Sequence, residues 1–432
     1  MIKRVIACAQ SNIKHQLVKD TASLAIGQFL RLVLQAIYFV TIARGLGSQQ
    51  YGAFVAMAAM VAVVAPFASM GGLNILLKNV SKDRSLLGVY WGNGLFLILV
   101  SGLCLTGVVL ICGPWFLGRG LTIALLLVCL SDLMLARIVD LASFAFAAVG
   151  RMGESAKLNV YVSLSRLAGI FFLVVTVKHP NVQEWTVAYV ASSFACSLYS
   201  FVRVTSIDGV RVSFTRMKQE ITEASYFAVS TSATTIYNDI DKTMLARLAD
   251  FTSTGIYGAA YRLIDVSMAP VSAMTLAATP EFFRRGHHGP KVAEEYAWRL
   301  IRRSAVFGSA VFLCLFIGAP ILPHLLGRSF QSSIEATRWL AIIPLLRCVH
   351  LFLAGALSAT GYQGTRACVQ VGVGIINVSL NIYFISRWSW RGAAWTSVMC
   401  DSLLLIGLWS ALKWACRNAE RTALASIPVS GG

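Results

Sequence analysis

The chain has 432 residues, of which 57% are hydrophobic and only 13% are charged, and its mean hydropathy is +0.69. A soluble protein has about 25% charged residues, so this composition excludes an ordinary soluble domain. The formal net charge of +18 does not indicate nucleic-acid binding, because no long polar segment is available to carry a basic stripe.

Apolar runs recur along nearly the whole sequence, and each is long enough to cross ~30 Å of hydrocarbon. We predict an all-α, polytopic membrane protein of about twelve transmembrane helices. The basic segment 1–20 is followed by a run too long and too polar on one face for a cleaved signal peptide, so we expect Met1 to be retained. The predicted spans are 21–42, 53–77, 86–112, 121–148, 158–177, 184–204, 222–248, 254–280, 304–326, 335–359, 366–386 and 391–415.

The first span carries polar residues at positions i, i+3, i+7 and i+10, which share one helical face. A shift of 203 residues places polar residues at the same positions of the seventh span. The stripe consists of Gln28, Arg31, Gln35 and Tyr38 in the first span, and of Thr231, Thr234, Asn238 and Asp241 in the seventh. A duplicated polar stripe is typical of a transporter built from two lobes.

A second repeat follows at an offset of 211 residues: Gly150, Gly153, Asn159, Ser163 and Arg166 correspond to Gly361, Gly364, Gln370, Gly374 and Asn377. Both matches preserve helix order and orientation, so we predict two parallel repeats of six helices around a central cavity. The predicted parts are a cytoplasmic segment 1–20, an N-terminal lobe 21–204, a linker 205–221, a C-terminal lobe 222–415 and a cytoplasmic tail 416–432.

Basic residues are concentrated on one side of the predicted membrane. By our count about 23 lie on the side of the two termini and about 7 on the other, so the positive-inside rule places both termini in the cytoplasm. The richest cluster falls in an expected loop, 281–303. The positive net charge therefore mainly reflects the orientation of the chain in the membrane. The basic residues on the cytoplasmic side also attract anionic lipid headgroups.

Ionisable side chains at bilayer depth cost about 2.5–3.5 kcal/mol each on insertion scales, so they need a partner or a function. Some have an oppositely charged neighbour one helical turn away, and such pairs are as consistent with a structural role as with a substrate-facing one. These pairs are Arg137 with Asp140, Asp239 with Lys242, and Arg262 with Asp265.

Three arginines, Arg31, Arg166 and Arg347, have no opposite charge one turn away, so each must face water, another helix or a ligand. A guanidinium group stays charged and bonds two phosphate oxygens at once, which favours a phosphate or pyrophosphate ligand over an apolar drug. Uncharged polar residues could hydrogen-bond sugar hydroxyls, although hydrogen bonding between helices is the more common role of such residues in membrane bundles. They are Gln28, Gln35, Asn238, Asn377 and Asn381.

No catalytic, metal or cofactor site is predicted. The ten cysteines are dispersed without a Cys-x-x-Cys pair, and His287 and His288 have no carboxylates beside them. The predicted loops are too short to hold a catalytic domain, so we do not expect an enzyme.

The turn after the first span, Ile42-Ala43-Arg44-Gly45-Leu46-Gly47 and then Tyr51-Gly52-Ala53-Phe54, resembles a turn of the bacterial polysaccharide flippases. These are the lipid-linked oligosaccharide translocases of the multidrug/oligosaccharidyl-lipid/polysaccharide exporter superfamily. The resemblance extends over nearly the whole chain, through Asp241-Lys242-Thr243-Met244-Leu245, Gly255-Ile256-Tyr257-Gly258-Ala259-Ala260-Tyr261-Arg262, Pro280, Ala359-Thr360-Gly361, Arg366, Asn377, Asn381 and Gly392-Ala393-Ala394-Trp395. It departs from the family at Trp388-Ser389-Trp390-Arg391, where relatives often have a shorter turn.

This resemblance implies a flippase in the bacterial inner membrane that moves an undecaprenyl-pyrophosphate-linked oligosaccharide to the exterior leaflet by alternating access. It implies Arg31 and Arg262 as pyrophosphate or acidic-sugar contacts, Arg166 and Arg347 deeper in each lobe, and membrane lipids, a polysaccharide polymerase and export machinery as partners. Asp241, with Asp265, is the expected proton-coupling group, and the membrane potential is an equally open driver.

Three other functions remain open on sequence grounds, and one of them is a scaffold for a glycan-export complex. The same fold could export small molecules, which would require fewer cavity arginines and would confer drug resistance. An integral-membrane glycan polymerase or ligase would require a sizeable exterior loop with catalytic residues, and the predicted exterior loops are short.

Overall fold

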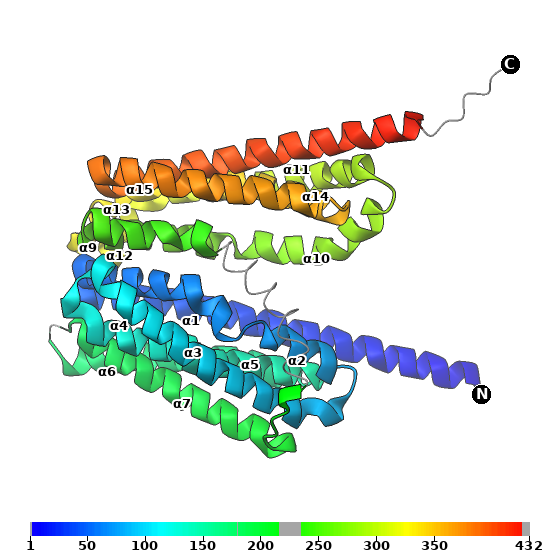
Figure 1. Ribbon diagram of the computed structural model, residues 1–432, viewed down its shortest axis with the longest axis horizontal. Coiled ribbons are helices and arrows are strands. Elements are labelled where there is room, and N and C mark those ends of the chain that lie inside the picture. Colours follow the sequence, from blue (N-terminus) through cyan, green and yellow to red (C-terminus); the bar gives the residue numbers. More distant parts are fainter. Residues whose placement is uncertain (1, 179, 216–234, 426–432) are drawn as a thin grey trace. The chain divides into compact units, whose positions relative to one another are not determined.

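The computed structural model describes residues 2–178, 180–215 and 235–425, with side chains described at position 27 and, within these ranges, from position 30 to position 421. Every regular element in these ranges is helical, so the predicted all-α class is confirmed (Figure 1). The chain divides into two compact units, Met1–Thr243 and Met244–Gly432. The boundary between these units differs from the boundaries of the predicted lobes, 21–204 and 222–415, and of the predicted linker, 205–221. That division into lobes and linker stays a prediction.

The first unit is a bundle of long helices in which α1 packs along α6, and α5, α6 and α7 pack against one another. Gly47, with φ 71°, breaks α1 between the first two predicted spans. Trp91, Leu76 and Phe146 are fully buried in the core. The helices are α1 (Ile2–Val64), α2 (Gly72–Val80), α3 (Leu87–Leu117), α4 (Thr122–Cys129), the π-helical turn η4 (Leu130–Leu135), α5 (Ala136–Ala148), α6 (Met152–Thr176) and α7 (Val182–Asp208). A further helix over 235–248 belongs to the first unit up to Thr243 and to the second from Met244.

The chain that leaves α7 is fixed to the start of α3. The Asp208 carboxylate accepts a hydrogen bond from the Gly88 backbone N–H at 2.8 Å, and the Arg211 N–H donates to the Gly88 carbonyl at 2.9 Å. A Cβ atom at Gly92 would lie 2.1 Å from the Arg211 carbonyl oxygen, so this close approach of two backbones requires glycine. The first part of the predicted linker is therefore packed onto the first unit.

In the second unit, α14 packs against α10, α11 and α15 (Figure 1). The Asp250 side chain caps α9, and Ser389, with φ 53°, breaks α15 between the last two predicted spans. The helices are α9 (Phe251–Ser267), α10 (Ala269–Gly286), α11 (Pro290–Gly318), α12 (Leu322–Leu326), α13 (Ser333–Leu340), α14 (Ile343–Ala359) and α15 (Gln363–Ala425).

The prediction of a long basic loop at 281–303 is wrong. Helix α10 continues to Gly286 and α11 begins at Pro290, so only His287–Gly289 connect them. Proline is favoured at the first helical position, and Gly289 supplies the positive φ of 105° that the turn requires. The arginines of this region therefore lie on helices.

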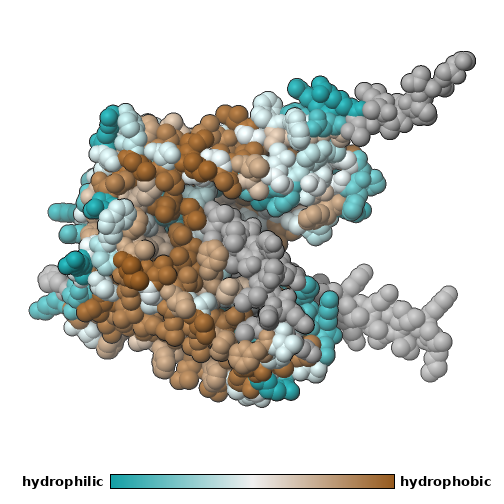
Figure 2. Space-filling model, viewed as in Figure 1, coloured by the Kyte–Doolittle hydropathy of each residue, from teal (hydrophilic) through white to brown (hydrophobic). Residues whose placement is uncertain are grey.

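Within the described residues, eight helices are long and apolar enough to cross a membrane, or nine if the bent pair α9–α10 forms one span. Large apolar side chains such as Ile111, Leu276 and Val306 are more than 70% exposed, which suits contact with lipid rather than water. On the face seen in Figure 2, hydrophobic residues cover much of each unit and hydrophilic residues gather at the helix ends. The protein is a multi-pass membrane protein, and the count of twelve spans stays a prediction.

Candidate functional site

A charged cluster in the first unit is centred on Arg166 of α6. Its Nη2 lies 3.5 Å from Oδ1 of Asp132, and its guanidinium carbon lies 4.5 Å from the centre of the Tyr189 ring. The Tyr189 hydroxyl donates to the same carboxylate oxygen at 2.7 Å. Arg166 is therefore held by a carboxylate of one helix and by an aromatic face of another.

The π-helical turn η4 gives Asp132 its place in this cluster. A π turn adds a residue to an α-helix, so it changes which side chains of the helix face inward, and such turns are frequent at functional sites. Ser131 in the same turn shares a hydrogen bond of 2.7 Å with Ser193 of α7. The Nε atom of Arg166 is buried and has no hydrogen-bond partner among the described residues, so the guanidinium is only partly satisfied.

Arg31 of α1 lies against the same helix as Arg166. Its Nη1 donates to Oδ1 of Asn159 at 3.3 Å, and the Asn159 amide donates to the Ser155 carbonyl at 3.1 Å. Gln35 is half-buried on α1, whereas the side chain of Gln28 lies outside the described residues. Two of the predicted arginines, Arg31 and Arg166, thus contact other helices of this unit. This agrees with the expectation that an intramembrane arginine with no opposite charge one turn away faces another helix, water or a ligand.

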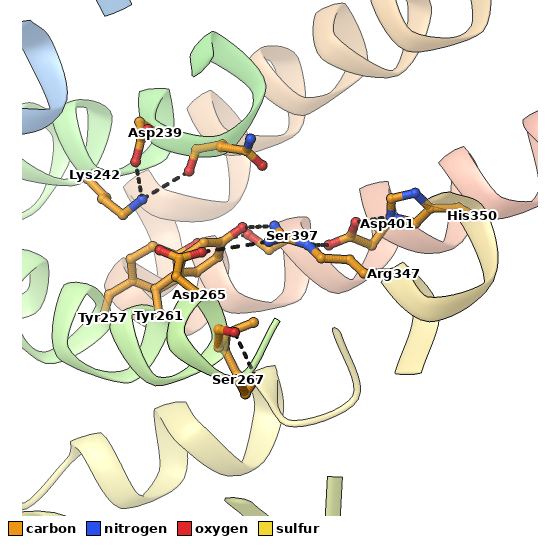
Figure 3. Close-up of polar contacts among 12 residues, drawn as sticks. Asp239, Lys242, Tyr257, Tyr261, Asp265, Ser267, Arg347, His350, Ser397 and Asp401 are labelled. Carbon is orange, nitrogen blue, oxygen red and sulfur yellow. Dashed lines mark hydrogen bonds and ion pairs between the residues drawn. The ribbon is translucent and has the colours of Figure 1, made fainter. Parts of the chain in front are cut away.

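The helix over 235–248 carries the second polar stripe, of which Thr231 and Thr234 lie outside the described residues. The predicted pair of Asp239 and Lys242 is confirmed, with Nζ 2.5 Å from Oδ1, and Nζ also donates to the Asn238 carbonyl at 2.9 Å (Figure 3). Asp241 is only 2% exposed, and its Oδ1 accepts a hydrogen bond of 2.7 Å from the Lys242 backbone N–H.

A larger charged cluster lies in the second unit around Arg347 of α14 (Figure 3). Its Nη1 is 3.7 Å from Oδ1 of Asp265 on α9, and its Nε is 3.8 Å from Oδ2 of Asp401 on α15. Another guanidinium nitrogen donates to the Tyr261 hydroxyl. His350, one turn after Arg347, places Nε2 3.1 Å from Oδ1 of Asp401. Asp401 thus contacts two groups of α14, and three helices meet at one cation.

For Arg262 and Asp265, whose role the sequence left open between a structural and a substrate-facing one, the structure shows another partner for the carboxylate. The carboxylate of Asp265 pairs with Arg347 on α14 rather than with Arg262 on its own helix. Arg262 is half-buried and has no hydrogen-bond or ion-pair partner among the described residues. The pair of Arg137 and Asp140, by contrast, is confirmed at 3.1 Å.

Comparison with known proteins assigns the family. A family model described as polysaccharide biosynthesis protein matches residues 17–285, well over half of the chain. The chain belongs to the polysaccharide biosynthesis protein family. A search among curated proteins finds no match.

The chain shares its fold with several solved transporters. A multidrug resistance MATE family transporter of the MOP superfamily, in an inward-facing conformation, has a TM-score of 0.71 at 14% identity, over 92% of this chain and 96% of that one. The lipid II flippase MurJ, in an inward closed conformation, has a TM-score of 0.66 at 14% sequence identity, over 90% of this chain and 87% of that one. A MOP superfamily transporter from Pyrococcus furiosus has a TM-score of 0.61 at 15% sequence identity, over 91% of this chain and 96% of that one. These similarities establish the fold.

In both clusters the arginine already faces carboxylates: Asp132 for Arg166, and Asp265 and Asp401 for Arg347. Among the described residues no group of three histidine, cysteine, aspartate or glutamate side chains could hold a metal ion. Asn377, predicted to bind sugar, is buried and accepts a hydrogen bond of 3.0 Å from Asn381 one turn later on the same helix. Its sugar-binding role stays a prediction.

The sequence interpretation missed Tyr189, Tyr261 and His350 as members of the charged clusters. A signal for His350 was available, because it lies three residues after Arg347 in an apolar span and so shares its helical face. The two tyrosines gave no comparable signal, since aromatic residues are common in membrane helices.

Proposed function

We propose that the protein is a flippase that moves a polyprenyl-pyrophosphate-linked oligosaccharide, with undecaprenyl as the carrier, from the cytoplasmic to the exterior leaflet of the bacterial inner membrane. It works by alternating access and without covalent chemistry, and both termini are cytoplasmic. Membership of the polysaccharide biosynthesis protein family supports this proposal, and so does the fold shared with a solved lipid II flippase.

The observation that carries the proposal is Arg262, a half-buried cation of a membrane helix with no partner among the described residues. An unpaired charge at this depth is costly unless a ligand neutralises it, and pyrophosphate matches the guanidinium fork. The other proposed binding residues are Arg31, Arg166, Arg347, Gln28, Gln35, Asn238 and Asn377.

Asp241 and Asp265 are the proposed coupling groups, because buried or paired carboxylates in membrane helices are the usual proton carriers. The membrane potential is the competing driver. Moving two negative charges outward across 100 mV releases roughly 4–5 kcal/mol, enough to favour export without a proton.

The test uses a strain that lacks the gene and carries Arg262→Ala, Arg262→Lys or Arg44→Ala. Loss of a charged contact worth about 1.5–3 kcal/mol should lower the flipping rate of Arg262→Ala by roughly 10- to 150-fold. Lipid-linked precursor should then accumulate, and surface glycan should disappear at normal protein levels. Arg44, exposed at the turn after the first span, should be replaceable without effect. Normal surface glycan from Arg262→Ala would contradict the proposal.

A small-molecule exporter is the second candidate, because the fold is also that of MATE multidrug transporters. That function predicts drug resistance on overexpression and no accumulation of lipid-linked precursor in the deletion strain. Precursor accumulation without resistance favours the flippase.

A further inference from the structure

The segment that departs from the family pattern, Trp388-Ser389-Trp390-Arg391, forms the break in α15. Ser389 has φ 53°, a conformation that residues other than glycine adopt only when the surroundings impose it. Here Ser389 Oγ donates to Ser253 Oγ at the start of α9, at 2.7 Å. The break is thus fixed by a second helix, and it holds Trp388 in a defined position.

Five aromatic rings form a continuous patch around this break, and we name Trp339, Tyr383, Phe384, Trp388 and Trp395 the aromatic patch. Ring centres of Phe384 and Trp388 are 5.4 Å apart, those of Trp388 and Trp395 are 5.8 Å apart, and those of Trp395 and Trp339 are 5.8 Å apart. Tyr383 contacts both Phe384 and Trp388. Tyr383, Trp388 and Trp339 remain 48%, 40% and 47% exposed, so the patch presents ring surface outward.

Charged groups border the aromatic patch. The Arg387 guanidinium carbon lies 4.2 Å from the centre of the Tyr383 ring, and its Nη1 donates to the Tyr383 hydroxyl. Arg391 forms a two-bond pair with Glu335 of α13, at 2.9 and 2.8 Å. Within the described residues, the indole N–H of Trp395 is buried and has no acceptor. Aromatic faces therefore lie beside both hydrogen-bond donors and a carboxylate acceptor.

This combination matches one ligand chemistry, a pyranose ring. One face of a sugar carries C–H groups that pack on an aromatic face, while its rim of hydroxyls requires donors and acceptors together. Anionic lipid headgroups would find only Arg387 unpaired with a carboxylate among the described residues of this surface, because Arg391 is already held by Glu335. Isolated tryptophans are usual at a membrane interface. Here, by contrast, five rings from two helices contact one another and form one continuous surface.

We propose that the aromatic patch binds sugar residues of the transported oligosaccharide, an inference that rests on the proposed function. The predicted orientation places the break in α15 on the exterior side, where the glycan is released. The patch is then a product-side site, separate from the arginines proposed to hold the pyrophosphate.

The test uses full-length protein in lipid nanodiscs and a defined probe: the free oligosaccharide released by mild acid from the lipid-linked precursor of the deletion strain. Binding is measured by calorimetry. Trp388→Ala should weaken binding about 2- to 12-fold, the range for a lost stacking contact, whereas Trp388→Phe should restore most of it. The matched control is Trp115→Ala, which removes an exposed tryptophan that contacts Phe116 edge-to-face in the first unit.

Unchanged binding by Trp388→Ala, or an equal loss in Trp115→Ala, overturns the inference. If Trp388→Ala is poorly folded, Trp339→Ala tests the same surface from α13. Failure of the flippase proposal is recognised separately: precursor would not accumulate in the deletion strain, and Arg262→Ala would transport normally.

Discussion

Asp401 offers the sharpest test of how the second unit holds its buried cation. Its side chain is 2% exposed and faces two groups of α14, His350 at 3.1 Å and Arg347 at 3.8 Å. Replacing it by leucine leaves both without this carboxylate, and removal of one partner of a buried ion pair costs about 3–5 kcal/mol. Asp265, the other carboxylate near Arg347, is 44% exposed, so Asp265→Asn should cost less than about 1 kcal/mol.

The assay is thermal unfolding of the purified protein in one detergent, followed by loss of the monodisperse peak. For a cooperative unit of this size, 3–5 kcal/mol corresponds to a fall in melting temperature of roughly 6–20 °C. A double-mutant cycle with His350→Leu should give a coupling of about 0.5–3 kcal/mol, because each residue is the other's partner. Equal melting temperatures for Asp401→Leu and Asp265→Asn, or strictly additive effects in the cycle, would refute this account.

Three further outcomes are expected. Gly392→Ala should lower the melting temperature by an amount equivalent to about 1–3 kcal/mol, because its Cβ would lie 2.2 Å from the Phe384 carbonyl oxygen, whereas Gly372→Ala on the same helix meets nothing within 4 Å and should be neutral or stabilising. Tyr189→Phe should cost about 1.5–3 kcal/mol in thermal unfolding, since it keeps the ring beneath the arginine but removes the donor to Asp132. Green fluorescent protein fused to either terminus should fluoresce and alkaline phosphatase should be inactive there, and the reverse pattern would contradict cytoplasmic termini.

Properties of a single helix could be predicted well from the sequence. Composition and the length of apolar runs gave the all-helical membrane class, and spacing within one helix gave the Asp239–Lys242 pair. The turn of α1 at Gly47 also falls where a break was expected between two spans.

Partners on different helices could not be predicted. Asp401 reaches Arg347 across more than fifty residues of sequence, and their meeting depends on how α14 and α15 are rotated about their axes. The spacing of residues within each span leaves that rotation undetermined. The same limit applies to Asp265. Arg262 lies one turn away in sequence, but the carboxylate of Asp265 pairs with Arg347 on α14. The π turn η4, which shifts the register at Asp132, carries no sequence signal that we recognised.

The anchoring of the chain after α7 has a practical consequence for engineering. Besides the contacts of Gly88, the Asn93 side-chain amide forms hydrogen bonds with both the backbone N–H and the carbonyl of Ser213. The residues up to Ser213 are therefore held against α3. A protease site, tag or split point placed between Gly209 and Ser213 would break backbone bonds of a folded unit rather than lengthen a tether. Any attempt to loosen or cut the connection between the halves should begin beyond that point.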